Sequence, residues 1–168
     1  MSETSQLQGF EPSAENLRNY RNALGLFGTG VTIVTANSSA GPIGITANSF
    51  SSVSLDPPLV LWSLARHSRR FAHFAEVDNM AIHILGADQT DLCHRFASDA
   101  FSFDDIDWQP GQGGTPLIQG SLACFECRIK DRHDGGDHEI IVSRVMRATT
   151  KPCDPLLVFG GKFGGFAG

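Results

Sequence analysis

GITANSFSSVSLDPPLVLWSLA, residues 44–65, places two very different strand-forming segments one after the other in the chain. The first segment is rich in Ser and Thr and carries no basic side chain. Asp56-Pro57-Pro58 ends it, because proline has no N–H to donate and keeps the residue before it extended. The second segment, PLVLWSLA at 58–65, is a short apolar run typical of a buried strand. The stretch therefore predicts two consecutive strands, one of them unusually polar.

The polar strand offers no cleanly hydrophobic face. Alternation places Thr46, Asn48, Phe50, Ser52 and Ser54 on one side and Ile45, Ala47, Ser49, Ser51, Val53 and Leu55 on the other. An edge strand with a solvated face would account for this pattern. The alternative is a binding surface, because the stretch presents neutral donors and acceptors in a row. Such a surface suits a flat heterocycle with carbonyl and ring-nitrogen atoms and a polyol tail.

The rest of the chain is built mostly from short strands joined by turns. Strands are expected over 30–36, from near Ile43, over 79–86, 117–131 and 138–147, and within 155–161; helices are expected over 11–27, from Ser68 and over 87–98. No glycine-rich dinucleotide fingerprint opens a helix after a strand, which argues against a Rossmann domain. The pattern predicts a mainly β fold, a closed antiparallel β-barrel with peripheral helices, in one domain over 1–168 with residues 1–12 flexible.

The composition fits one folded domain and excludes several classes of protein. The chain has 168 residues, of which 41% are hydrophobic and 18% charged, so it can bury a continuous core. Its net charge of −5 argues against a general nucleic-acid binder, which needs a basic surface. The first twenty residues lack the pattern of a secretory signal, and no apolar run approaches the roughly 20 residues that cross a bilayer. We therefore expect a cytoplasmic protein with no membrane partner.

Cys124 and Cys127 form a CxxC pair that invites a metal interpretation. A zinc site needs about four ligands, and no second CxxC or spaced His pair follows. The pair also lies in an expected strand, where residues three apart point to opposite faces. We expect structural thiols and no metal site.

A candidate anion site lies at the expected helix start. Ser68, followed by Arg69 and Arg70 and preceded by Arg66, combines free N–H groups, the helix dipole and cationic side chains, which favours a phosphate. An ordinary helix cap with solvated arginines would show the same residues. The phosphate interpretation gains support because the polar strand lies only about 20 residues away in the chain.

These motifs together resemble a known family. GVTIVTA, GPIGITANSFSSVSLDPPLVLWSL, HSRRF and GGDHEIIVSRV are similar to the flavin reductase-like, FMN-binding split-barrel family, over about residues 16–165. The strongest signals are GITANSFSSVSLDPPLV and Gly136-Asp137-His138. The resemblance implies a Greek-key split barrel, a homodimer and a flavin in a groove near the subunit interface.

The resemblance also implies roles for individual residues. Thr46, Ala47, Asn48 and Ser49 would line the isoalloxazine and ribityl chain; Ser63, Leu64 and Ala65 would lie beside the ring; His67, Ser68 and Phe71 would hold the phosphate, with Arg69 or Arg70 helping; and His138 would face the nicotinamide. Ser51, Ser52 and Phe163 complete the cofactor-binding candidates. The tail VFGGKFGGF departs from the family, which often carries a tyrosine and an arginine there. Stacking on the nicotinamide remains available to the Phe rings of the tail.

The function that the resemblance implies is NAD(P)H:flavin oxidoreduction. NADH or NADPH would pass a hydride to FMN or FAD, and the reduced flavin would go to a separate flavin-dependent monooxygenase. The cofactors carry this chemistry, which agrees with the lack of an obvious catalytic carboxylate pair or Ser-His-Asp spacing. Two alternatives remain open: a pyridoxamine-phosphate-oxidase-like FMN oxidase and a flavin-binding module without turnover.

Overall fold

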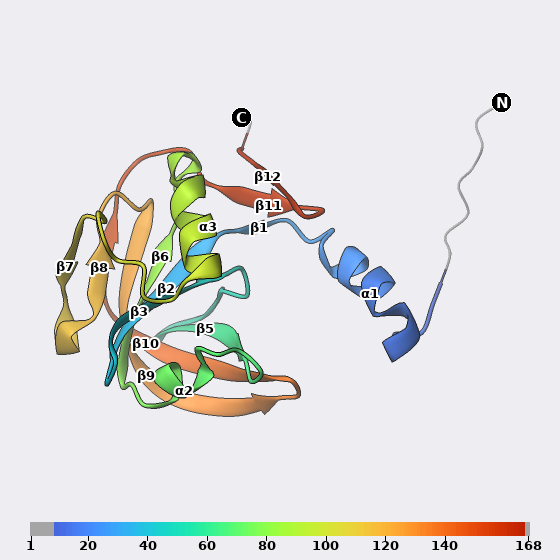
Figure 1. The fold of residues 1–168 in the computed structure, drawn as a ribbon, viewed down its shortest axis with the longest axis horizontal. Coiled ribbons are helices and arrows are strands. Elements are labelled where there is room, and N and C mark those ends of the chain that lie inside the picture. Colours follow the sequence, from blue (N-terminus) through green and yellow to red (C-terminus); the bar gives the residue numbers. More distant parts are fainter. Residues whose placement is uncertain (1–8, 167–168) are drawn as a thin grey trace.

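A computed structural model describes residues 9–166, so most of the segment expected to be flexible, 1–12, lies outside the described residues. Its main element is one seven-stranded sheet (Figure 1). The strands lie in the order β3 (Gly41–Ala47), β2 (Thr32–Ser38), β6 (Asn79–Ile84), β9 (Ala123–Gly135), β10 (His138–Thr150), β5 (Pro58–Ala65) and β4 (Ser51–Leu55). Every neighbouring pair is antiparallel. The expected mainly β class is confirmed.

The barrel is split, because hydrogen bonds do not close it. The two edge strands, β3 and β4, follow each other in the chain, and the described residues show no ladder between them. Between them lies the segment 48–50, which belongs to neither strand. The expectation of a closed barrel is therefore wrong in this respect: the sheet curls, but the chain leaves the ladder where the barrel would close.

Two hydrophobic clusters hold the sheet in shape. The barrel interior contains, among others, Val34, Ile43, Val60, Trp62, Leu64, Phe74, Met80, Ile82 and Ile141. Trp62 packs edge-on against Phe74 with ring centroids 5.4 Å apart. The second cluster, which includes Ile33, Leu85, Cys93, Phe96 and Leu156, lies between the sheet and α3 (Thr90–Ser98). Burial of large side chains in both clusters is the main stabilising contribution to the fold.

A buried histidine links the sheet to an outer strand. His83 of β6 is fully buried, and its Nδ1 lies 3.1 Å from Ile33 O. Its Nε2 accepts the N–H of Ile118, also at 3.1 Å. This arrangement requires a neutral ring with the proton on Nδ1, because Nε2 acts as an acceptor. Burial lowers the pKa of His83 to about 4.

The remaining elements surround the barrel. They are β1 (Thr29–Gly30), β11 (Leu157–Phe159) and β12 (Lys162–Gly164) in a small sheet, β7 (Trp108–Pro110) paired with β8 (Pro116–Ile118), α2 (Phe71–Ala75), and 3₁₀ turns at Ala14–Asn16, Ala87–Gln89 and Gln112–Gly114. The strand expected over 117–131 is divided between β8 and β9, with Gly120 at φ +82° in the break. A left-handed φ of this kind suits glycine and interrupts a strand.

The helix expected over 11–27 is shorter in the structure. α1 covers Leu17–Leu24 and projects away from the barrel (Figure 1). None of its residues is buried, although Leu17, Tyr20 and Leu24 repeat at helical spacing. An isolated helix of this length is marginal in water. Within residues 9–166 no helix is long and apolar enough to cross a membrane.

Candidate functional site

The polar stretch consists of two strands separated by a turn. β3 ends at Ala47 and β4 begins at Ser51. At the turn, the Ser49 hydroxyl donates to Ser63 O at 3.1 Å and accepts the Ser63 N–H at 3.0 Å. The pairing of β5 with β4 stops at Leu61, and Ser49 therefore supplies the next hydrogen-bond partner along the edge of β5. The expectation of a single alternating strand is wrong, because a side-chain hydroxyl replaces the backbone partner.

Two more hydroxyls fix this turn from inside the protein. Thr46 Oγ1 donates to Cys93 O of α3 at 2.6 Å, and Thr32 Oγ1 donates to Ala47 O at 2.6 Å. The end of β3 is thus tied both to α3 and to β2. Asn48, at the turn itself, is exposed to solvent. The hydroxyls shape the turn, and Asn48 is the polar side chain that it presents outward.

The end of β5 and the start of β10 lie side by side. Ala65 is the register partner of His138, and Ser63 that of Ile140. The Arg66 N–H also donates to Asp137 O at 2.9 Å, which anchors the Gly-Asp-His turn next to β5. The sheet therefore brings the sequence signals at 63–65 and 136–138 together.

His138 is oriented by its neighbour in the chain. Its Nδ1 lies 2.7 Å from Asp137 Oδ1. This hydrogen bond, together with the charge of the imidazole, lowers the pKa of the Asp137 carboxyl. An ionised carboxylate only accepts hydrogen bonds, so Nδ1 carries the proton. In the neutral ring Nε2 is then left as an acceptor on a side chain that is 40% exposed.

The segment 66–70 forms a turn before α2. Ser68 N–H donates to Ala65 O at 3.0 Å, and the Ser68 hydroxyl accepts the Arg70 N–H at 3.2 Å. The helix begins at Phe71, and Arg70 takes the N-cap position. The expectation of a helix that starts at Ser68 is therefore wrong. The hydroxyl closes a short local turn. Because α2 has only five residues, its helix dipole offers little attraction to an anion.

The two arginines of this turn have different environments. Arg70 donates from Nη2 to Phe96 O and Ala97 O, both at 3.1 Å, and so caps the carboxyl end of α3. Burial, followed by repulsion from Arg69, lowers the pKa of Arg70. Arg69 is exposed. Of the two, Arg69 is the cation that remains accessible to a ligand.

A groove with a volume of about 910 Å³ opens between α1, the turn after β3 and the β11–β12 hairpin. We call it the α1 groove; Leu24, Phe27, Asn48, Ser49 and Gly160 are among the residues that line it. The Gly160 N–H donates to Gly25 O at 2.8 Å and joins the hairpin to the end of α1. Its volume lies in the range of small-molecule sites, and polar groups at the turn face apolar side chains of α1 across it.

Several candidates from the sequence lie apart from this groove. The Leu64 side chain is fully buried in the barrel, so only its backbone can face a ligand. Ser51 and Ser52 are exposed on β4, and the Ser51 hydroxyl bonds locally to Ser52 O at 3.1 Å. The Phe163 ring packs edge-on against His94 of α3, with centroids 5.4 Å apart. His67 is exposed, and Phe71 lies under the Arg66 guanidinium at 5.8 Å.

Sequence reasoning missed the contribution of α1 to the groove. Leu24, Leu26 and Phe27 line it, whereas the sequence analysis places them only within the helix expected over 11–27. Leu26 and Phe27 stand between Gly25 and Gly28, two glycines that disfavour a helix, and this was the available signal that the helix ends before them. Apolar side chains just past a helix end are candidates for a binding surface.

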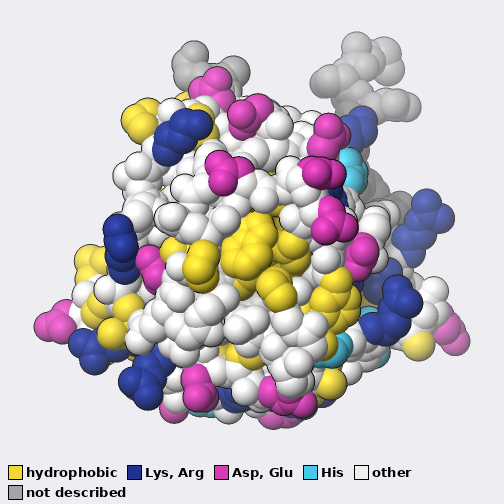
Figure 2. All heavy atoms as spheres, turned by 60° about the vertical axis from the view of Figure 1, so that its left-hand side comes forward, with side chains coloured by type: hydrophobic (Ala, Val, Ile, Leu, Met, Phe, Trp, Pro, Cys, Tyr) yellow, Lys and Arg dark blue, Asp and Glu magenta, His cyan; other side chains and the backbone are white. Residues whose placement is uncertain are grey.

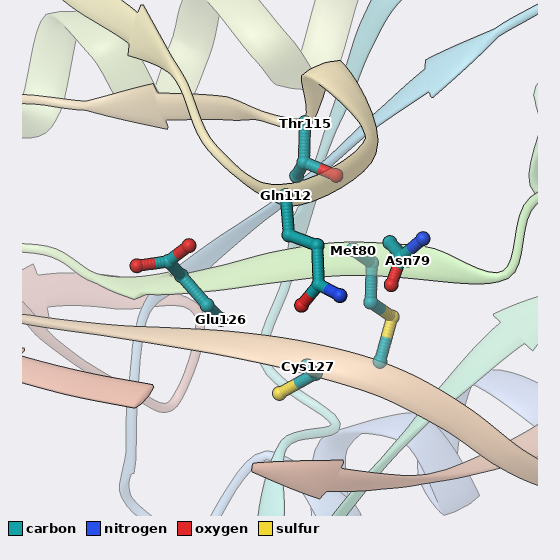
Figure 3. A pocket seen from close by; sticks show the side chains of 6 residues that line it. All are labelled: Asn79, Met80, Gln112, Thr115, Glu126 and Cys127. Carbon is teal, nitrogen blue, oxygen red and sulfur yellow. The ribbon is translucent and has the colours of Figure 1, made fainter. Parts of the chain in front are cut away.

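The cysteine pair and a second hollow offer no further site. Burial raises the pKa of Cys124 and of Cys127 to about 12, which keeps both as thiols. Within residues 9–166 no three His, Cys, Asp or Glu side chains gather to hold a metal. Figure 3 shows the hollow, where the Gln112 side chain points from its loop across β6 toward β9 and ends between Glu126 and Met80. It has no room for even one water molecule.

Comparison with known proteins adds to this geometry. The family model described as "Flavin reductase like domain" matches residues 24–167. The protein called "FMN reductase (NADH) SmoA" of Agrobacterium fabrum is 55% identical over 158 residues, 94% of this chain and 91% of that protein. The "Flavin-dependent monooxygenase, reductase subunit HsaB" of Rhodococcus jostii is 36% identical over 167 residues, 98% of this chain and 86% of that protein.

A solved structure shares the fold over nearly the whole chain. It is the Streptomyces globisporus NADH:FAD oxidoreductase SgcE6 in complex with NAD and FAD fragments. It superimposes with a TM-score of 0.86 at 38% sequence identity, covering 95% of this chain and 98% of that one. The likeness includes both the barrel and the elements around it.

Proposed function

This chain belongs to the flavin reductase-like family, and on that premise we propose that it is an NADH-dependent flavin reductase that transfers hydride to FMN or FAD. The observation that carries the proposal is the 55% identity with an NADH-dependent FMN reductase over nearly the full length of both proteins. The HsaB relative, a reductase subunit of a monooxygenase, supports a second part of the proposal. The reduced flavin is passed to a separate flavin-dependent monooxygenase.

The residues around the turn after β3 fit a flavin. The backbone of Ala47–Ser49 and the end of β5 would hold the flavin ring, and Ser49 joins these two segments through two hydrogen bonds. The α1 groove, at about 910 Å³, accommodates the ring and its ribityl chain. Asn48 would supply a neutral donor and acceptor, and the Arg69 guanidinium would supply the positive charge for the phosphate, with Ser68 and His67 as neighbouring polar groups.

When bound, the flavin supplies the ring atom that accepts the hydride. The protein contributes the positioning of the flavin. The hydrogen bonds of Thr46 and Ser49 fix the turn before any ligand arrives, so little ordering is left for the binding step. Leu24 and Phe27 line one side of the groove with apolar side chains.

His138 positions the nicotinamide. Because Asp137 holds the Nδ1 proton, Nε2 accepts a hydrogen bond from the carboxamide of NADH. The register pair of His138 with Ala65 supports this role, because it lies at the strand end that would border the flavin ring. A contact of this kind orients the two rings for transfer and is not itself part of the hydride step.

The protein acts as a homodimer. α1 exposes Leu17, Tyr20 and Leu24 without burying any of them, and Phe27 just beyond it is 79% exposed. A helix whose apolar side is exposed gains stability when a second copy of the chain covers that side. The same contact covers the open side of the α1 groove. Figure 2 shows a further group of hydrophobic side chains on the face that carries β7 and β8, bordered by acidic side chains.

Steady-state oxidation of NADH and of NADPH, each measured with FMN, FAD and riboflavin, tests the proposed function. We expect turnover with NADH and with both phosphorylated flavins. A protein that binds flavin without oxidising either nicotinamide is a binding module, and one that oxidises an amine instead is an oxidase of the pyridoxamine-phosphate type. Either result overturns the proposal.

A further inference from the structure

One part of the chain carries its whole net negative charge. Residues 86–121, which we call the acidic segment, contain six aspartates, no lysine and a single arginine, Arg95. In the rest of the chain the lysines and arginines equal the aspartates and glutamates in number, so the net charge of −5 comes from this segment alone. The segment contains α3, the loop after it and the β7–β8 hairpin. Charge of one sign that is concentrated in one part of a fold indicates a partner of the opposite charge.

A groove with a volume of about 310 Å³ opens on the acidic segment, between α3 and the loop at 105–107, and we call it the acidic groove. Four of the six aspartates line it, namely Asp88, Asp91, Asp105 and Asp107. The apolar side chains of Leu92 and Ile106 also line it. On the face that carries β7 and β8, acidic side chains border a group of hydrophobic ones (Figure 2). The groove thus combines an apolar lining with an excess of carboxylates.

The protein does not neutralise these carboxylates itself. Among the ion pairs within residues 9–166, none involves an aspartate of the acidic segment. The one cation of the segment, Arg95, donates from Nη1 to the backbone oxygen of Asp104 at 2.6 Å. The charge of the groove is therefore available to a partner.

The loop that carries three of the aspartates is fixed on two sides. Phe103 packs edge-on against Phe96 of α3, with ring centroids 4.9 Å apart. The Gln119 N–H donates to Asp107 O at 2.9 Å, and the hydrogen bond of Arg95 ties the same loop to α3. Because the backbone is held in this way, little ordering of the loop is left for the binding of a partner.

The charge of the groove selects among possible partners. Carboxylates repel nucleic acids, anionic membranes and the phosphates of the cofactors. Within the described part of the chain no three acidic side chains gather to hold a metal ion. A twofold contact between two copies of this surface would bring like charges together. Lysine and arginine match both features, because their charged ends pair with carboxylates and their stems pack on apolar side chains. The acidic groove therefore fits a basic surface of another protein.

We propose that the acidic groove is the docking surface for a basic segment of the monooxygenase that receives the reduced flavin. The proposal rests on the proposed function, in which the reduced flavin passes to a separate protein. Opposite charges on the two proteins raise their rate of encounter. Ion pairs that stay exposed to water and salt add little to affinity, so the contact is short-lived. A contact of this kind lets one reductase serve its partner repeatedly.

Calorimetric titration of the full-length protein with a synthetic peptide of alternating lysine and leucine tests this proposal. We expect binding that weakens as salt is added, and that protects backbone amides within residues 86–121 from hydrogen exchange. The double variant Asp91→Asn, Asp107→Asn should bind the peptide about three- to tenfold more weakly, because two exposed ion pairs are lost. A peptide of lysine and serine should also bind more weakly, since it leaves the apolar lining uncovered.

A matched control removes the same amount of charge elsewhere. Glu15 and Asp78 are exposed carboxylates outside the acidic segment, so the double variant Glu15→Gln, Asp78→Asn should bind the lysine–leucine peptide like the wild type. Circular dichroism checks that both double variants are folded. Flavin reduction by NADH should be unchanged in the variant of Asp91 and Asp107, because neither side chain lines the α1 groove.

Several results would overturn the proposal. They are wild-type peptide affinity in the folded variant of Asp91 and Asp107, exchange protection outside residues 86–121, and a loss of flavin reduction in that variant. Spermidine that binds as tightly as the peptide would assign the groove to a small cation, and an altered mass of the variant in light scattering would assign it to self-association; both also overturn the proposal. Wild-type protein that fails to reduce flavin overturns the proposed function instead, so the two failures are distinguishable.

Discussion

Replacing Ser49 by Ala tests the turn on which the proposed flavin site is built. The substitution removes both the bond to Ser63 O at 3.1 Å and the bond from Ser63 N–H at 3.0 Å, and β4 offers no strand residue in exchange. A neutral hydrogen bond contributes about 0.5–1.5 kcal/mol, and water reaches this half-buried site. We therefore expect the free energy of unfolding to fall by about 1–2 kcal/mol. For a protein of this size that is a decrease in Tm of about 3–6 °C.

Flavin affinity reports on the same change. A turn that is no longer tied to β5 must be ordered when flavin binds, so we expect a several-fold higher Kd for FMN. Urea unfolding and fluorescence titration measure the two effects. Ser54→Ala is the matched control, because Ser54 lies on the neighbouring edge strand β4 and is expected to change stability by no more than about 0.5 kcal/mol. If Ser49→Ala keeps both the stability and the FMN affinity of the wild type, the turn is not held by this hydroxyl and the reasoning fails.

Three further predictions concern stability at low pH, the nicotinamide contact and the dimer. The pKa of His83 in the folded protein is about 4, below the usual 6.5, so between these pH values the unfolded chain binds a proton that the folded chain does not. Urea unfolding should therefore show the free energy of unfolding falling by up to about 3 kcal/mol from pH 6.5 to pH 4. The variant His83→Gln should lose this part of the pH dependence. His138→Ala should raise the KM for NADH about five- to a hundredfold and leave the Kd for FMN within a few-fold; a collapse of FMN binding with normal NADH kinetics would assign His138 to the flavin instead. Leu24→Asp should give a monomer mass in light scattering where the wild type gives a dimer, and an active wild-type monomer at micromolar concentration would contradict the dimer.

Local sequence predicted the apolar strands and one helix well. PLVLWSLA became β5 with the expected bounds, because prolines mark its beginning and its alternate residues fill the barrel. The helix expected over 87–98 became a 3₁₀ turn followed by α3. In both segments the hydrophobic pattern and the end signals agree, and no distant contact overrides them.

Where contacts between residues far apart in the chain determine the local structure, the sequence alone did not predict that structure. The polar stretch was expected as one strand, but the Ser49 hydroxyl binds a strand 14 residues further along and forms a turn instead. The helix was expected from Ser68, but Arg70 reaches the carbonyls at the end of α3 and the helix begins after it. Neither side-chain partner can be identified from spacing in the sequence. The contribution of α1 to the groove was also not predicted, because none of its residues is buried and its apolar side chains line a groove whose other residues are distant in the chain.

The sequence likewise predicted some features of the candidate site and missed others. The family motifs located the end of β5, the Gly-Asp-His turn and the segment around Ser68, and the sheet brings the first two together through the pair of Ala65 with His138. The motifs did not separate residues that shape the site from residues that face it. Thr46 and Ser49 turn inward to α3 and β5, whereas Asn48 and Arg69 remain open to a ligand.

Anaerobic mixing of the purified protein with FMN and NADH tests the central claim most directly. Without oxygen the reduced flavin accumulates, so the loss of the yellow flavin absorbance reports hydride transfer itself. We predict that one FMN is bleached for each NADH oxidised, at a rate that rises with protein concentration and far exceeds that of the two cofactors alone. Bleaching no faster than in the protein-free mixture would contradict the claim that this chain is a flavin reductase.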